Sequence, residues 1–141
     1  MKFQFNDGGR SEAGYKGTAG DCVTRAIAIA TGKPYQEVYD ALNVMCKKKL
    51  AYGKSSSGVS RKVYDKYLKS IGWNWHPTMG IGTGCKVHLR DGEIPMGNII
   101  CRVSRHLVAV IDGIVNDNHN CQRNENRCVY GYYYKWELKN N

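Results

Sequence analysis

The sequence contains no apolar run of the roughly 20 residues that a membrane-spanning helix needs. Its first residues, Met-Lys-Phe-Gln-Phe-Asn-Asp, are too polar and too few for a secretory signal peptide. It also contains no internal repeat and no segment with the composition of a domain linker. We therefore expect one domain over residues 1–141, located in the cytoplasm and without a membrane partner.

No two of the six cysteines form a C-x-x-C pair, which excludes the usual signature of a zinc ribbon or a redox motif. In a cytoplasm the six are expected to be free thiols, one of them catalytic. Were the chain exported, Cys121–Cys128 would be a plausible disulfide. The densest group of soft ligands is His119, Cys121 and Cys128, and a zinc site there would need His88 or Cys85 as well. We favour packed thiols, with no metal and no other cofactor.

Acidic residues are scarce, at 12 against 21 Lys and Arg, so that the net charge is +9. Such a balance attracts nucleic acid and acidic partners in general. Apart from Lys47-Lys48-Lys49, however, the basic residues are spread along the chain. We interpret them as a solvated surface and keep a basic nucleic-acid-binding domain as the third alternative for function.

Apolar periodicity predicts helices first and strands second, which is an α+β fold with N-terminal helices packed on a C-terminal antiparallel sheet. Residues 1–19 are polar and rich in glycine and are predicted to form an extended N-terminal arm. The aromatic residues 130–136 could stack on bases or sugars, but we favour a strand packed in the core. The predicted helices cover residues 20–31, 33–50 and 59–70, and the predicted strands cover residues 73–76, 98–103, 106–111, 114–118 and 128–138.

Cys22 lies on the first turn of the first predicted helix, which Thr18 or Asp21 could cap. A helix N-terminus carries unpaired N–H groups and about half a positive charge, so it stabilises a thiolate. Cysteines in such positions titrate below the ordinary value for a thiol of about 8.5. We predict that Cys22 is a nucleophile. The alternative is a small apolar residue buried on a helix.

Asp112-Gly113 is a favoured pair for a two-residue hairpin turn between the strands 106–111 and 114–118. With these as turn residues, Ile111 pairs with Ile114 and His106 lies opposite His119. A four-residue turn leaves the same pairing. The register of the hairpin therefore follows from its turn.

Side chains alternate between the two faces of a strand, so His106 and Asp117 share one face while Asn116 and Asn118 point to the other. Asp117 is then the diagonal neighbour of His106, within reach of a side-chain contact. A carboxylate there would set the tautomer of the imidazole and stabilise the imidazolium. We predict a base at His106 oriented by Asp117. The alternatives are a structural histidine and an acid that only closes the hairpin.

Three short motifs carry a resemblance: Gly20-Asp21-Cys22, His106-Leu107-Val108-Ala109-Val110 and Ile114-Val115-Asn116-Asp117. In this order they resemble the papain-like cysteine protease superfamily, in particular the bacteriocin-processing peptidases. The whole chain also resembles uncharacterised bacteriophage and prophage proteins of similar length. The resemblance implies a phage-encoded cysteine peptidase or related thiol acyl hydrolase that acts on a peptide or protein, such as a host protein, in the host cytoplasm.

In that family a glutamine a few residues before the cysteine usually donates to the oxyanion, together with the N–H of the cysteine. Residues 15–21 contain neither Gln nor Asn. Gln4 and Asn6 lie further upstream, and Thr18 is a third candidate. This departure supports an alternative function, a catalytically weak papain-like effector that binds a host protein or a small signalling molecule.

Overall fold

The computed structural model describes residues 1–16, 20–46 and 59–136. Within these residues, three helices and two sheets make up an α+β fold, which confirms the predicted class. The elements in chain order are β1 (Lys2–Phe5), α1 (Cys22–Thr31), α2 (Tyr35–Cys46), α3 (Arg61–Ser70), β2 (Asn74–Pro77), β3 (Val87–His88), β4 (Asn98–Val103), β5 (His106–Ile111), β6 (Ile114–Asp117), β7 (Cys128–Val129) and β8 (Gly131–Tyr134).

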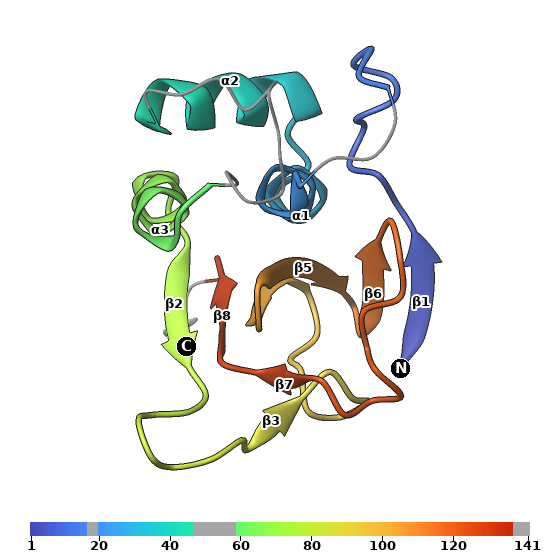
Figure 1. Cartoon of the computed structure of the whole chain (residues 1–141), viewed down its shortest axis with the longest axis vertical. Coiled ribbons are helices and arrows are strands. Elements are labelled where there is room, and N and C mark those ends of the chain that lie inside the picture. Colours follow the sequence, from blue (N-terminus) through green and yellow to red (C-terminus); the bar gives the residue numbers. More distant parts are fainter. Residues whose placement is uncertain (17–19, 47–58, 137–141) are drawn as a thin grey trace, which may run out of the picture.

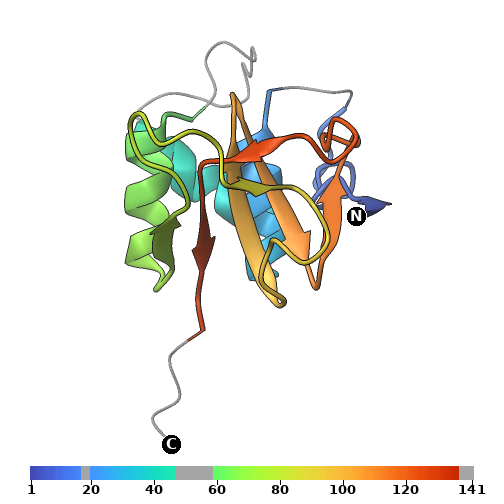
Figure 2. The ribbon, with the colours of Figure 1, turned by 90° about the horizontal axis from the view of Figure 1, so that it is seen from below.

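The main sheet has the strand order β1-β6-β5-β4-β8-β2, and β3 pairs with β7 in a separate two-stranded sheet. The helices lie on one side of the main sheet, while β3 and β7 lie on the other side (Figures 1 and 2). β5 has β4 and β6 as its neighbours, and α1 packs across it. β5 is therefore flanked by a strand on each side and covered by a helix on one face.

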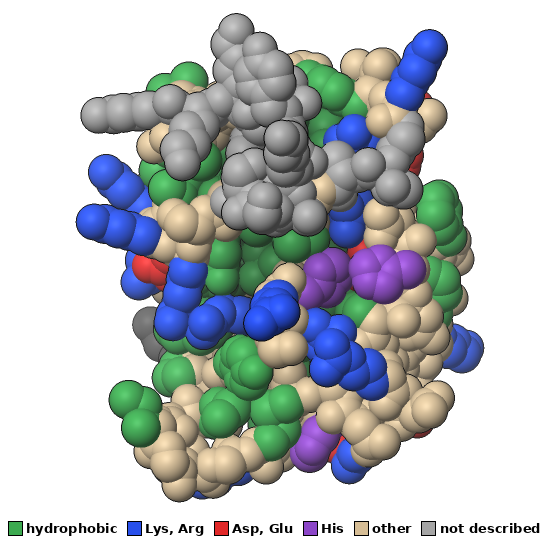
Figure 3. Space-filling model, viewed as in Figure 1, with side chains coloured by type: hydrophobic (Ala, Val, Ile, Leu, Met, Phe, Trp, Pro, Cys, Tyr) green, Lys and Arg blue, Asp and Glu red, His purple; other side chains and the backbone are tan. Residues whose placement is uncertain are grey.

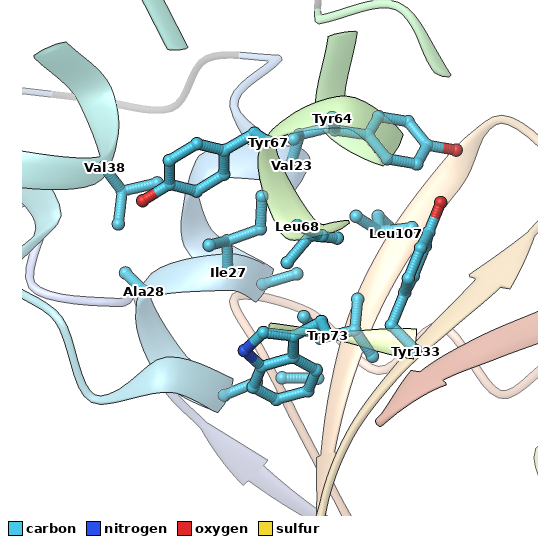
Figure 4. Packing of buried hydrophobic residues seen from close by; sticks show 14 of the residues in the cluster. Val23, Ile27, Ala28, Val38, Tyr64, Tyr67, Leu68, Trp73, Leu107 and Tyr133 are labelled. Atoms are coloured by element: carbon cyan, nitrogen blue, oxygen red, sulfur yellow. The ribbon is translucent and has the colours of Figure 1, made fainter. Parts of the chain in front are cut away.

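α1 is predominantly apolar and fills the space between the sheet and the other two helices. Val23 and Ile27 of α1 pack with Leu68 of α3, Leu107 of β5 and Tyr133 of β8 (Figure 4). On the opposite face of the sheet, alternate residues of the same strands, such as Val108 and Val110, enter a second core. Burial of both faces explains why β5 is an almost continuous apolar run.

The ends of α1 follow from its flanking residues. Gly32 adopts a left-handed φ of 75°, and its N–H donates to the carbonyl of Ala28 at 3.0 Å, which ends the helix as predicted. Asp21 occupies the N-cap position, but its side chain makes no capping hydrogen bond, so the prediction that it caps the helix is wrong. Its carboxylate is bound by Arg25 instead. Thr18, the other predicted cap, lies outside the described residues.

The N-terminal arm contains a strand that was not predicted. Lys2–Phe5 forms β1, which runs parallel to β6 at the edge of the sheet, so the sheet is mixed and not antiparallel throughout. β1 has no buried residue, and an exposed edge strand lacks the apolar run that marks a strand in a sequence. Further along the arm, Gly8 passes so close to α1 that a Cβ atom would lie 3.1 Å from the Cα of Arg25.

The last predicted strand is two strands. The chain changes sheet at Tyr130, whose N–H donates to the carbonyl of Arg102 at 2.8 Å and whose carbonyl accepts from Thr78. Gly131 then lets β8 approach β2, because a Cβ atom there would lie 2.3 Å from the ring of Trp75. The end of the predicted strand, residues 137 and 138, lies outside the described residues.

One pair of cysteines is bonded, contrary to the expectation of free thiols. Cys85 and Cys128 form a disulfide with a Cα–Cα distance of 5.9 Å, so the alternative pair Cys121–Cys128 is also wrong. The reason is the pairing of β3 with β7, which sets His88 opposite Cys128 and brings Cys85 beside it. Cys22, Cys46, Cys101 and Cys121 take no part in a disulfide.

Among the described residues, no helix is both long enough and apolar enough to cross a membrane.

Candidate active site

The three residues predicted for the site lie at the ends of their elements. These ends meet where β5 begins and β6 finishes, next to the start of α1. Cys22 is the first residue of α1, His106 the first of β5 and Asp117 the last of β6. The register of the hairpin is the predicted one, with Ile111 opposite Ile114. The structure therefore brings together the side chains that the sequence pattern singled out.

His106 and Asp117 form a short hydrogen bond, with 2.6 Å between Nε2 and Oδ2. Both side chains are largely buried, at 10% and 3% exposed, so water competes little for this contact. The bond occupies Nε2 and leaves Nδ1 of His106 to exchange a proton with a thiol. A carboxylate in this position selects the tautomer that a base beside a cysteine requires.

Cys22 has the electrostatics of an activated thiol. Burial by itself raises the pKa of Cys22, but hydrogen bonding to the His106 imidazole and its positive charge outweigh burial, so that the pKa is below its ordinary value. The backbone N–H of Leu107 and the charge of Arg25 lower it further. Burial also opposes the charged form of His106, yet hydrogen bonds with Asp117, Cys121 and Cys22 raise the pKa of His106. The thiolate–imidazolium form of the pair is thus favoured.

Arg25 fixes the carboxylate of Asp117, and sequence analysis did not single it out. An Arg25 guanidinium nitrogen lies 3.2 Å from Oδ1 of Asp117, which also accepts the N–H of Asn118 at 2.7 Å. Burial raises the pKa of Asp117, but His106 and Arg25 lower it below its ordinary value, so the carboxylate stays ionised. One signal was available: Arg25 is the single charged residue of α1 and follows Cys22 by three positions, on the same helix face.

Asp21 holds Arg25 from the other side. Its carboxylate binds the Arg25 guanidinium, accepts the Tyr35 hydroxyl at 2.7 Å and lies 3.3 Å from Arg10. Because Arg10 belongs to the N-terminal arm and Tyr35 begins α2, this network ties both segments to the site. A buried cation between two carboxylates with further donors around it is a rigid support for Asp117.

A cleft of about 600 Å³ opens in front of Cys22 and His106. Its lining includes Val59 and Tyr64 on one side and Arg102, Leu107 and His119 on the other. The ring of His119 lies 5.2 Å from that of His106, and the side chain is 59% exposed. Figure 3 shows this face, on which adjoining histidines lie next to a row of Lys and Arg side chains. Cys22 therefore lines a cleft with room for a molecule considerably larger than water.

The candidate oxyanion donors upstream of Cys22 do not line this cleft. Gln4 is exposed on β1, and its side chain donates to the carbonyl of Phe5. Asn6 donates to Asn116, which points away from Asp117 as predicted. Thr18 lies outside the described residues. The donors that remain are the N–H groups of the first turn of α1, since the side chain of Asp21 does not cap them.

The group considered for zinc, His119, Cys121 and Cys128, does not come together, because Cys128 is bonded to Cys85. Within the described residues, the candidate ligands of a metal ion are instead His106, Asp117 and Cys121, whose ligand atoms lie within 4.8 Å of one another. Arg25 already neutralises the carboxylate of this group. Cys121 thus places a second buried thiol beside His106.

No protein-family model, no curated protein and no solved structure matches this chain.

Proposed function

We propose that this protein is a papain-like cysteine peptidase or a related thiol acyl hydrolase with a Cys22–His106–Asp117 triad. The observation that carries the proposal is the 2.6 Å bond between His106 and a buried, ionised Asp117, together with the lowered pKa of Cys22. An imidazole held in this way stores the proton of the thiol and returns it to a leaving group.

The reaction has two stages. The Cys22 thiolate attacks the carbonyl carbon of the substrate, the oxyanion faces the N–H groups at the start of α1, and His106 protonates the leaving group. The product of this stage is a thioester on Cys22. His106 then takes a proton from water, which attacks the thioester, releases the acid and restores the thiolate–imidazolium pair.

An activated ester such as p-nitrophenyl acetate tests this proposal without knowledge of the natural substrate. We expect one acetyl group on Cys22, found by intact mass and peptide mapping, followed by turnover of many equivalents per chain. Cys22→Ala and His106→Ala should abolish both signals. Cys46→Ala is the matched control, because Cys46 ends α2 and does not line the cleft. Equal ester hydrolysis by the Cys22→Ala variant would refute the proposal.

A second candidate is an effector that binds its target without turnover. The observation that favours it is the placement of Gln4 and Asn6, neither of which reaches the cleft. In that case Cys22 would accept one acetyl group and not release it. The amount of nitrophenol released per protein chain separates the two candidates. One equivalent indicates acylation without turnover, and many equivalents indicate a hydrolase.

A further inference from the structure

The cleft in front of Cys22 is lined by four arginines, Arg25, Arg61, Arg102 and Arg105, and its described lining contains no Asp or Glu. Arg25 is neutralised by Asp21 and Asp117. Within the described part of the chain, the other three form no ion pair with a carboxylate.

Two of these arginines are positioned by aromatic rings, which hold a guanidinium without removing its charge. The guanidinium carbon of Arg61 lies 5.4 Å from the ring centre of Trp75, and that of Arg102 lies 5.5 Å from the ring centre of Tyr130. Arg102 also hydrogen-bonds the hydroxyl of Tyr64, a residue close enough to Cys22 for the charge of the thiolate to affect it. Arg61 also interacts by charge with Asp65, but that carboxylate is already bound by Tyr133 at 2.7 Å and Lys69 at 2.9 Å.

The third arginine, Arg105, is placed by the turn that delivers His106. It is an exposed residue between β4 and β5 with a left-handed φ of 56°, a conformation that residues other than Gly, Asn and Asp rarely adopt. The three unneutralised cations therefore come from α3, β4 and the β4–β5 turn and meet at one cleft. Clustered cations in a cleft concentrate the field and attract anions.

We propose that this cleft selects peptides with Asp or Glu side chains next to the bond that Cys22 cleaves. Carboxylates match guanidinium groups in charge and in geometry, because two N–H groups can donate to two oxygens. Nucleic acid fits the site less well, because it offers no acyl carbon to the thiol. Moreover, the rings of Trp75 and Tyr130, on which bases could stack, are covered by Arg61 and Arg102. This inference rests on the proposed function, since it names the substrate of that thiol.

Two alkylating agents of nearly equal shape, iodoacetate and iodoacetamide, differ in the charge that the cleft would select. We expect Cys22 to react with iodoacetate at least as fast as with iodoacetamide, whereas the uncharged small thiol N-acetylcysteine amide should prefer iodoacetamide. In the variant R61Q/R102Q/R105Q, the iodoacetate-to-iodoacetamide ratio at Cys22 should fall by roughly five- to tenfold. K2Q/K86Q/R123Q, which removes three charges outside the lining of the cleft, should leave the ratio within about twofold of the wild-type value.

A measurement on the unmodified chain keeps the test independent of how the triple variant folds. In about 1 M salt the Debye length falls to about 3 Å, so the ratio at Cys22 should approach that of N-acetylcysteine amide. A ratio at Cys22 that is unchanged by salt and by the triple substitution would overturn the inference.

Matched peptide probes extend the test to the substrate itself. Peptidyl acyloxymethyl ketones with Asp or Glu beside the reactive carbonyl should label Cys22 about tenfold faster than their Asn or Gln counterparts. Equal rates, or protection of Cys22 by a single-stranded oligonucleotide where an acidic peptide gives none, would contradict the proposal. A Cys22 that reacts slowly even with iodoacetamide would instead contradict the proposed function.

Discussion

In the described part of the chain, one Cys–His–acid group is built around Cys22 and another around Cys85, and the contrast between them shows what makes such a group reactive. In the first, Cys22, His106 and Asp117 meet at the junction of α1 with the main sheet. In the second, the sulfur of Cys85 lies 3.6 Å from Nε2 of His88, and Nδ1 of His88 lies 3.3 Å from Glu93. The residue types and the order of contacts are alike in the two groups.

The surroundings of the two groups differ. Asp117 is 3% exposed, while Glu93 is 27% exposed and His88 lies on a strand of two residues. The sulfur of Cys85 is bonded to that of Cys128 and is therefore no nucleophile. Cys22, by contrast, begins a ten-residue helix, and its base begins a strand buried on both faces. Burial and rigid placement, and not the set of three residue types, separate a candidate catalytic group from a surface cluster.

The strongest test of this contrast replaces each histidine in turn. His106→Ala should slow the alkylation of Cys22 by iodoacetamide near pH 6 by about 10²- to 10³-fold, because the thiolate loses its counterion. His88→Ala should leave that rate within about twofold. The alkylation reaction is quenched at a series of times, and the alkylated fraction of the Cys22 peptide is measured by mass spectrometry. Equal effects of the two substitutions would mean that Cys22 does not depend on His106.

Each group also has an arginine beside its acid, Arg25 beside Asp117 and Arg90 beside Glu93. Substitutions of these two arginines are expected to differ in their effect on the free energy of unfolding. Arg25→Met removes the buried cation that lies between Asp21 and Asp117 and should lower the free energy of unfolding by about 3–5 kcal/mol. Arg90 lies 3.2 Å from Glu93 at the surface, and Arg90→Met should cost under about 1 kcal/mol. Urea unfolding of both variants gives the comparison. A small effect of Arg25→Met would contradict the idea that Arg25 supports the site.

The next comparison substitutes the acid of each group, Asp117 and Glu93. Asp117→Asn keeps the shape of the side chain but removes the charge that stabilises the imidazolium, so we expect about a tenfold slower alkylation of Cys22 near pH 6. The matched substitution Glu93→Gln should have no measurable effect on Cys22. A wild-type rate in Asp117→Asn would reduce Asp117 to a residue that closes the hairpin.

Removal of the disulfide is expected to leave the reactivity of Cys22 nearly unchanged. Substitution of both Cys85 and Cys128 by Ser removes a cross-link across 43 residues and should lower the free energy of unfolding by roughly 2–4 kcal/mol. The alkylation rate of Cys22 should stay within about twofold of the wild-type rate. A large drop would show that the β3–β7 region supports the site after all.

The sequence predicted the hairpin well because a two-residue turn and strict alternation leave one register. The pairing of His106 with Asp117 follows from that local rule. The end of α1 at Gly32 was predictable for the same reason, since it depends on neighbouring residues, whereas the helix begins two residues later than predicted.

Features that depend on contacts between distant segments could not be predicted. β1 is recognisable only through its partner β6, and Arg25 acquires its role only when Asp117 is brought to it by the fold. The disulfide depends on the pairing of two strands of two residues each, which carry no periodicity. Arg61, Arg102 and Arg105 lie far apart in the sequence, so their common cleft becomes visible only in three dimensions.

The most direct test of the central claim is the pH dependence of iodoacetamide alkylation of Cys22, followed in the native chain and in the urea-unfolded chain. The pKa of Cys22 is lowered and that of His106 is raised, so the thiolate persists as pH falls below the ordinary thiol value of about 8.5. We expect the rate at Cys22 of the native chain to stay nearly constant from about pH 8 to about pH 6, while the rate at Cys22 of the unfolded chain falls with the thiolate fraction of an ordinary cysteine. Two parallel curves would contradict the account.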